Sequence, residues 1–273
     1  MNNGMSALYA QNGIEYAVDD ISGALLDPAA VHEGRATEMK FFHGMRVYDR
    51  VPRDEQRQTG GKIIGTKWID VNKGDAERPN IRCRLVGKEF KTTPDDALYA
   101  STPPLEALRC IVSRAATLDH KGERREIMVN DVSRAYFYAK ATRCMYIELP
   151  QEDPYYDSDM LGRLRLCLYG TRDAALNWQQ TLSSHLTEAG FKRGIGHPSV
   201  FHHPTKDIWT LVHGDDYCSA GSAASLDWMQ EILTKRYEIK TQRLGEGKTK
   251  AGEPKQKEGQ VLNRVVRITK DGW

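Results

Sequence analysis

The sequence lacks several features that would assign the chain to particular classes of protein. Its five cysteines are scattered singly, which argues against a disulfide framework and against a zinc site. No apolar run is long enough to cross a bilayer, and the first residues lack the basic and apolar regions of a signal peptide. These absences, together with an apolar content of 40%, predict a soluble globular protein of a reducing compartment without a membrane partner.

An excess of one charge is also missing, because the formal net charge is only +2. The charges are nevertheless unevenly distributed. Residues 62–91 hold eight Lys and Arg against four Asp and Glu, and residues 233–270 hold eleven against four. Two basic regions around an acidic centre suit a protein that meets phosphates and holds a metal, although an ordinary solvated surface has the same composition.

Two adjacent carboxylates mark the centre of the sequence. Asp215 and Asp216 follow Gly214, and short apolar runs at 208–212 and 217–220 read as two strands of a hairpin. Neighbouring carboxylates repel each other unless they share a cation, and hard oxygen ligands of this kind suit Mg²⁺. The alternative is a solvated Gly-Asp turn without a metal.

A second acidic position follows the β-rich run 126–132. Asp131 begins the pattern Asp-Val-x-x-Ala-Tyr-Phe, and Gly-Asp-Asp lies further along the chain. These two motifs resemble motifs A and C of a reverse transcriptase palm. The basic run Arg84-Leu85-Val86-x-Lys88 and a Leu-Tyr-Gly turn before a helix carrying Trp178 extend the likeness. From about residue 31 onward, the chain resembles the reverse transcriptase domain of copia-type LTR retrotransposons.

The resemblance implies an α+β fold with a reverse transcriptase palm and fingers, in which a central antiparallel sheet has helices packed on one face. It also implies a domain order. We expect a poorly structured lead-in at 1–30, a helix and fingers hairpin at 31–102, a palm at 103–241, and a flexible basic loop with a terminal strand toward the thumb at 242–273. The hairpin strands are predicted at 62–71 and 81–90.

The resemblance implies an RNA-directed DNA polymerase that uses two-metal nucleotidyl transfer. The implied catalytic residues are Asp131, Asp215 and Asp216, which would hold two Mg²⁺ ions together with the backbone carbonyl of Val132. Mn²⁺ is the expected substitute ion. The partners would be an RNA or DNA template with its primer, deoxynucleoside triphosphates and the remainder of a Pol polyprotein. For the family, the location is the cytoplasmic virus-like particle or the nucleus.

Further residues are expected to meet the nucleotide. A row of cations on one face of a strand fits a triphosphate, and the choice between Arg82 and Arg84 for the closest contact stays open. The whole implied nucleotide-binding set is Arg82, Arg84, Lys88, Tyr136, Tyr169 and Gly170. Tyr136 is expected beneath the incoming sugar, with simple core packing as the alternative role. Lys240 and Arg243 are expected to contact nucleic acid.

Two features depart from the family pattern. His213 and Gly214 stand where the family has an aromatic or aliphatic pair, and Gly-Asp-Asp also occurs in viral RNA-dependent RNA polymerases. The alternative function is therefore a catalytically inactive, retrotransposon-derived fragment that only binds nucleic acid.

Overall fold

The structure is a computed structural model that describes residues 8–11, 14–75, 77–90, 102–119, 121–262 and 264–269. The chain forms two compact units, each made of two separate segments. Unit 1 comprises Met1–Leu98 and Ala139–Asn177, and unit 2 comprises Tyr99–Tyr138 and Trp178–Trp273. The predicted palm range 103–241 differs from this division, because its part 139–177 packs within unit 1.

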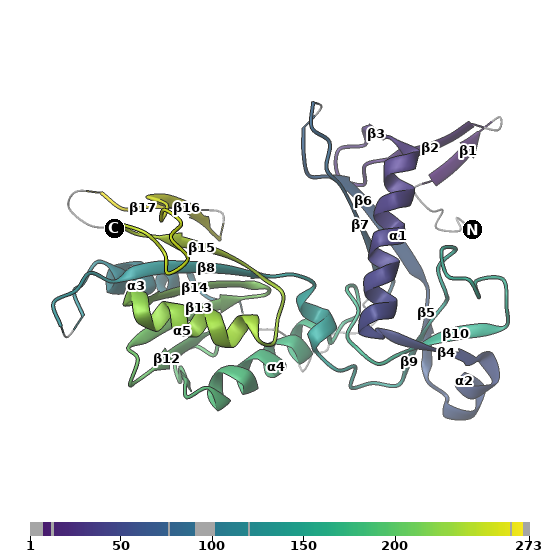
Figure 1. Ribbon diagram of the computed structural model, residues 1–273. Coiled ribbons are helices and arrows are strands. Elements are labelled where there is room, and N and C mark those ends of the chain that lie inside the picture. The colour runs from purple at the N-terminus through teal and green to yellow at the C-terminus, as the bar shows by residue number, and fades with distance from the viewer. Residues whose placement is uncertain are drawn as a thin grey trace. The chain divides into compact units, whose positions relative to one another are not determined.

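The described residues of unit 1 form three small sheets, two complete helices and the start of a third helix (Figure 1). The first sheet consists of β1 (Leu8–Gln11), β2 (Ile14–Val18) and β3 (Leu25–Leu26). The second has the order β4-β10-β9-β5, formed by β4 (Tyr48–Pro52), β10 (Met160–Leu164), β9 (Met145–Ile147) and β5 (Lys62–Ile64). The third is the hairpin of β6 (Thr66–Asn72) and β7 (Ile81–Gly87).

The segment 1–30, expected as a loose lead-in, contains β1, β2 and β3 among its described residues. The turn after β2 is built around Asp19. Its carboxylate accepts hydrogen bonds from the backbone N–H groups of Ile21 and Ser22, and from that of Asn72 at the end of β6. A short polar side chain that satisfies backbone donors in this way replaces the hydrogen bonds that a loose segment would make with water.

Helix α1 (Pro28–Met45) is the helix expected before the fingers hairpin in the segment 31–102, and it begins three residues earlier than that segment. It begins at Asp27, whose side chain accepts from the N–H of Ala29, and it ends at Arg46 in the left-handed conformation. The helix packs on β7 and buries Arg35, whose guanidinium donates to Asp70 at 2.6 Å and to Glu152 at 2.9 Å. The short helix α2 (Arg53–Thr59) follows β4.

The predicted strand 62–71 is two strands in the structure. Chain direction changes at Gly65, whose carbonyl accepts from the N–H of Lys88 at 2.8 Å. The part before Gly65 is β5, which pairs in parallel with β9, and the part after it is β6, which pairs with β7. Periodicity predicted the strand residues, whereas the break at Gly65 lies where the pairing partner changes from β9 to β7, which periodicity does not show.

Unit 2 is organised around one six-stranded antiparallel sheet with the order β11-β12-β13-β14-β8-β15 (Figure 1). The strands are β8 (Glu126–Val132), β11 (Lys192–Arg193), β12 (Val200–His203), β13 (Ile208–His213), β14 (Asp216–Gly221) and β15 (Ile239–Leu244). Every pairing in this sheet is antiparallel. The α+β class and the central antiparallel sheet are therefore as predicted.

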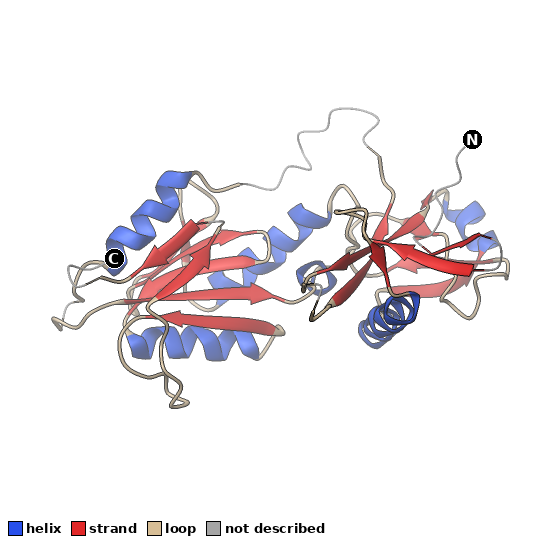
Figure 2. Cartoon of the chain, turned by 90° about the horizontal axis from the view of Figure 1, so that it is seen from above, coloured by secondary structure: helices blue, strands red, loops and turns tan. Residues whose placement is uncertain are grey.

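Helices lie on both faces of this sheet, and not on one face as expected (Figure 2). Helix α3 (Leu105–Ala115) packs against Leu211, Cys218 and Ile127. Helix α5 (Ala223–Thr234) lies on the opposite face, where Thr210 contacts the Met229 sulfur at 3.7 Å. Alternating side chains along β13 and β14 are apolar or small on both faces, so both faces have to be covered. The boundary between the units falls inside α4 (Ala174–Glu188).

The last part of unit 2 is a hairpin of β16 (Glu258–Val261) and β17 (Arg264–Arg267), where a single terminal strand was expected. Val261 and Val266 pack into the core beside α3. The preceding loop, expected to be flexible, is held by backbone hydrogen bonds of Gln256 to Arg243 and Gly245. None of the helices in the described part of the chain is long and apolar enough to cross a membrane.

Candidate active site

The sheet register brings the two acidic motifs together. Asp131 on β8 lies opposite Asp216 on β14, and Asp216 lies opposite His213 on β13. Lys240 on β15 lies opposite Asp131 on its other side. Directly opposed residues of antiparallel strands project to the same face, so these four residues form one row across the sheet. We call it the carboxylate row, and the side of the sheet on which it lies the carboxylate face.

The hairpin between β13 and β14 is the tight turn that the sequence predicts. Its two loop residues are Gly214 and Asp215, and Gly214 has a φ of 61°. Both loop carbonyls accept a hydrogen bond. The Gly214 carbonyl accepts from the indole N–H of Trp178 at 2.7 Å, and the Asp215 carbonyl accepts from the N–H of Val132 at 3.0 Å. The turn that carries the two carboxylates is thus fixed to other parts of unit 2.

Both burial and neighbouring negative charges act on Asp216. Burial, followed by the negative charges of Asp215 and Asp131, raises the pKa of Asp216 to about 6, while His213 acts in the opposite direction. A divalent cation would remove this repulsion, so the charges and the oxygen donors fit Mg²⁺. Within the described residues, however, no three Asp, Glu, His or Cys side chains are close enough together to hold a metal ion.

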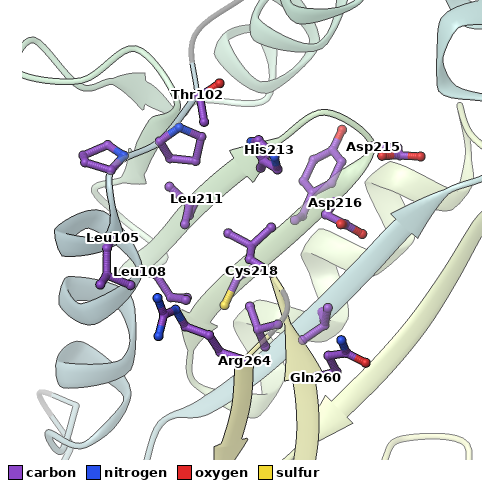
Figure 3. Close-up of a pocket in the computed structure, with 16 residues that line it drawn as sticks. Thr102, Leu105, Leu108, Leu211, His213, Asp215, Asp216, Cys218, Gln260 and Arg264 are labelled. Atoms are coloured by element: carbon purple, nitrogen blue, oxygen red, sulfur yellow. The ribbon is translucent and has the colours of Figure 1, made fainter. Parts of the chain in front are cut away.

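A cavity of about 630 Å³ adjoins the carboxylates. Figure 3 shows Asp215 and Asp216 at one end and Leu105 and Leu108 of α3 at the other. The β16–β17 hairpin contributes Arg264 and other residues to the wall. These contributions from α3 and the hairpin are not visible in the sequence, because their positions depend on packing between distant segments.

The residues expected at the triphosphate lie in unit 1. Arg82, Arg84 and Lys88 alternate with the buried residues Cys83 and Leu85 along β7 and just beyond it, as predicted from the strand period. These three cations therefore belong to the face of the hairpin opposite to that packed on the core.

Arg84, Tyr169 and Gly170 come together in unit 1. The Arg84 guanidinium lies 5.1 Å from the centre of the Tyr169 ring. Gly170 has a φ of 85°, and a Cβ added there would lie 2.1 Å from the Gly87 carbonyl oxygen. The N–H of Gly87 donates to the Tyr169 carbonyl at 2.7 Å. Gly170 is therefore required both by its conformation and by the close approach of β7.

An ion cluster around the buried Glu89 carboxylate holds the turn at 169–172 in place. The carboxylate of Glu89 accepts both terminal nitrogens of Arg143 at 2.8 Å, the Lys62 ammonium at 3.0 Å and the N–H of Arg172 at 2.9 Å. Arg143 also donates to Asp173 at 2.5 Å. These bonds, led by those from Arg143, lower the pKa of Glu89 to about 2. The acidic and basic positions are visible in the sequence, but their pairing is not.

Tyr136 lies in unit 2, in the 3₁₀ helix η2 (Ala135–Tyr138) that follows the strand carrying Asp131. The chain enters η2 through Arg134 with a φ of 51°. Tyr136 is half-buried. Its expected place beneath the incoming sugar stays a prediction.

Arg243 differs from its predicted role as a nucleic-acid contact. It is 6% exposed and lies on the α5 face of the sheet, opposite to the face of the carboxylate row. Its guanidinium donates to Asp227 at 2.5 Å and to Glu126 at 2.9 Å. One position along β15 reverses the face of a side chain, so Lys240 is exposed on the carboxylate face while Arg243 is in the core.

Both acidic motifs lie within the part of the chain that matches a single protein family. Residues 47–249 match the family described as reverse transcriptase (RNA-dependent DNA polymerase). The match covers most of the chain, which therefore belongs to this family.

Curated relatives narrow the family further. The chain is 26% identical over 215 residues to the retrovirus-related Pol polyprotein from transposon RE2 of Arabidopsis thaliana. It is 29% identical over 217 residues to the transposon Ty1-ER2 Gag-Pol polyprotein of Saccharomyces cerevisiae. These matches cover 76% and 77% of this chain but only 14% and 11% of the relatives. The predicted copia-type reverse transcriptase family is thereby confirmed.

Among solved structures, the chain is similar to apo telomerase from Candida tropicalis truncated from the C-terminal domain. That match has a TM-score of 0.47 and 9% identity, and it covers 92% of this chain and 61% of the telomerase chain.

Proposed function

We propose that this chain catalyses RNA-directed DNA synthesis, in which a deoxynucleotide is transferred to the 3′-hydroxyl of a primer. The observation that carries the proposal is the pairing of Asp131 with Asp216 on neighbouring strands, next to Asp215. Burial, followed by the charges of Asp215 and Asp131, raises the pKa of Asp216, and a divalent cation bound near this pair would relieve that penalty. Membership of the reverse transcriptase family supports the same reaction.

Asp131, Asp215 and Asp216 would hold two Mg²⁺ ions, with the Val132 carbonyl as a further ligand. When bound, such ions lower the pKa of the attacking hydroxyl and stabilise the leaving pyrophosphate. The protein would then act mainly by holding the carboxylates, the primer and the nucleotide at the distances and orientations that the reaction needs. Lys240, exposed beside Asp131, would meet a phosphate of the nucleic acid.

Unit 1 would supply the nucleotide contacts of the fingers. Arg84, whose guanidinium is held over the Tyr169 ring, is better ordered for a triphosphate contact than the exposed Arg82. Lys88 would add a further positive charge. The Tyr169–Gly170 turn, which packs against Gly87 of β7, would face the nascent base pair, and Tyr136 of unit 2 would exclude a ribose 2′-hydroxyl.

The partners that follow are a primer annealed to an RNA or DNA template and deoxynucleoside triphosphates. Because the chain spans only 14% and 11% of the length of the two transposon relatives described above, the remainder of a Pol polyprotein is a further proposed partner. Copia-type polymerases set the expectation that the template is RNA.

Primer extension tests the proposal. Wild type and Asp131→Asn are compared on matched RNA and DNA templates with Mg²⁺ or Mn²⁺, and primer–template binding is measured in parallel by fluorescence anisotropy. We expect extension by the wild type, while the variant binds without extending. Binding by both proteins with equal, background extension would overturn the polymerase proposal and support the nucleic-acid-binding alternative.

A further inference from the structure

We infer that Trp178 is a positioning residue for the catalytic turn, which it holds through the backbone of Gly214. The inference rests on the proposed function, because it assigns the turn the task of placing Asp215 and Asp216 for metal binding. It adds a residue that touches neither substrate nor metal.

The hydrogen bond to Gly214 is well formed and protected. Trp178 is 1% exposed, and its indole N–H donates to the Gly214 carbonyl at 2.7 Å. Gly214 itself is exposed at the tip of a two-residue loop. Loop tips usually turn their carbonyls to water and move more than the strands they join. Here a buried donor holds the first carbonyl of the loop.

A second donor holds the other loop carbonyl. The N–H of Val132, next to Asp131, donates to the Asp215 carbonyl at 3.0 Å. Val132 ties the turn to the strand that carries Asp131, whereas Trp178 ties it to the helix α4. With both carbonyls fixed, rotation of either peptide plane in the loop would break a hydrogen bond, and the carboxylates that follow the turn are restrained in the same way.

The indole is itself held by two tyrosines. The Trp178 ring lies 5.3 Å from the Tyr237 ring at 78° and 6.5 Å from the Tyr138 ring, and the two tyrosines are 5.1 Å apart at 81°. Edge-to-face contacts of this kind are favourable and fix the orientation of the rings. We call Tyr138, Trp178 and Tyr237 the aromatic support.

The two tyrosines of the aromatic support belong to segments next to the strands that carry Asp131 and Lys240. Tyr138 ends the 3₁₀ helix that follows Asp131, and Tyr237 precedes the strand that carries Lys240. The Tyr138 hydroxyl accepts from the N–H of Glu238 at 2.9 Å, which joins these two segments. One cluster therefore sets the turn relative to Asp131 and Lys240, and its bond to Gly214 is the link to the turn.

Removing the indole N–H should therefore loosen the carboxylates without removing a metal ligand. Groups that orient metal ligands typically change metal affinity or activity by about 10–100-fold when they are mutated. We expect Trp178→Phe to weaken Mn²⁺ binding and to lower kcat by about tenfold at saturating nucleotide. The KM for deoxynucleotide and the Kd for primer–template should stay within about twofold of wild type, since the variant leaves their contacts in place.

The test measures Mn²⁺ binding by electron paramagnetic resonance in the absence of nucleotide, together with steady-state kinetics. Trp228→Phe is the matched control, because Trp228 of the same unit packs on Phe191 and His203, away from the turn. We expect the control to bind Mn²⁺ and to react as the wild type does. Equal Mn²⁺ affinity and an equal kcat for Trp178→Phe and Trp228→Phe would overturn the positioning role.

Two comparisons separate this inference from the proposed function. If the wild type binds Mn²⁺ no better than Asp131→Asn, the proposed metal site falls and the positioning role falls with it. If the wild type binds Mn²⁺ and Trp178→Phe does so equally, only the positioning role falls.

Hydrogen exchange on the wild-type chain covers the case in which Trp178→Phe does not fold. The indole N–H of Trp178 and the amide N–H of Val132, which donate to the two loop carbonyls, should exchange at least about tenfold more slowly than the same groups in an unstructured peptide. Exchange at the unstructured rate would contradict a fixed turn.

Discussion

Asp131 and Asp216 face each other across two neighbouring strands, although they belong to motifs that are far apart in the sequence. This pairing places two like charges side by side on one face of a sheet, which is unfavourable in the absence of a cation. The fold therefore keeps an electrostatic penalty at this position, and that penalty is measurable.

Replacing Asp216 should stabilise the metal-free protein. Asp216→Asn removes a carboxylate whose pKa is raised to about 6, so at neutral pH the folded state gains about 1–3 kcal/mol. We expect a higher Tm for this variant than for wild type in EDTA, measured by differential scanning fluorimetry. Saturating Mg²⁺ should reduce this difference in Tm, because bound Mg²⁺ stabilises the wild type more than a variant that lacks one of the metal ligands.

Asp157→Asn, on an exposed loop of unit 1, is the control and should leave the Tm unchanged. A lower Tm for Asp216→Asn than for wild type in EDTA would show that the carboxylates do not repel each other.

Gly170 should tolerate alanine poorly. A Cβ at this position would meet the Gly87 carbonyl oxygen at 2.1 Å, in addition to the strain of its φ of 85°. Gly60 has a similar φ of 67° but open space around it, so Gly60→Ala measures the conformational strain alone. We expect Gly170→Ala to cost at least about 2 kcal/mol more than Gly60→Ala in urea unfolding. Equal costs would mean that β7 moves away from the turn easily.

Substitution of Arg243 should lower the stability of the protein, whereas substitution of Lys240 should weaken its binding of nucleic acid. Arg243→Met leaves Asp227 without this guanidinium and Glu126 with Lys255 alone, and we expect a loss of about 3 kcal/mol in the free energy of unfolding. Lys240→Met, on the exposed carboxylate face, should leave stability nearly unchanged but weaken primer–template binding and reduce its salt dependence. Urea unfolding and anisotropy titrations at several salt concentrations measure the two effects. The reverse assignment of effects would restore Arg243 as a surface contact.

Protonation of Glu89 should cause much of the loss of stability of unit 1 between pH 4.5 and 2. Its pKa is lowered from an ordinary value of 4.5 to about 2, so its contribution to stability is present above pH 4.5 and is lost as the pH falls toward 2. Glu89→Gln should be less stable than wild type at pH 7, and the difference should shrink between pH 4.5 and 2. Urea unfolding across this range measures it, and Glu106→Gln, exposed on α3, should follow the wild-type curve. A constant difference at every pH would assign the effect to packing.

Tyr136 tests the proposed selection of the sugar. If its ring lies beneath the incoming nucleotide, Tyr136→Ala should raise kcat/KM for ribonucleotides relative to deoxynucleotides, by orders of magnitude. A packing role would lower both values alike and leave their ratio unchanged. The ratio of the two kcat/KM values in single-nucleotide extension, compared with wild type, distinguishes the two roles.

The sequence predicted the strands of the carboxylate hairpin, the helix before the fingers hairpin and the helix that carries Trp178, because these follow from local periodicity and turn residues. It did not predict the short helix α2, whose residues are polar and lead into a Gly-Gly pair. It did not predict which face Arg243 occupies, because the register of β15 depends on its pairing with β8. The cluster of Glu89, Arg143 and Asp173 was also not predictable, since it joins three segments that only the folded chain brings together. Helices on both faces of the sheet likewise depend on packing that no single segment encodes.

The interleaving of the two units has a consequence for synthesis and for truncation. Each unit is built from two segments, and the chain passes between them after Leu98, Tyr138 and Asn177. During translation unit 1 can complete its core once residue 177 has left the ribosome, while β8 still lacks its neighbours β14 and β15. Until then β8 has two unpaired edges, which makes this nascent stage prone to aggregation. A single cut after Asn177 keeps unit 1 whole but leaves residues 99–138 of unit 2 attached to it, so isolating unit 2 requires a linker in place of residues 139–177.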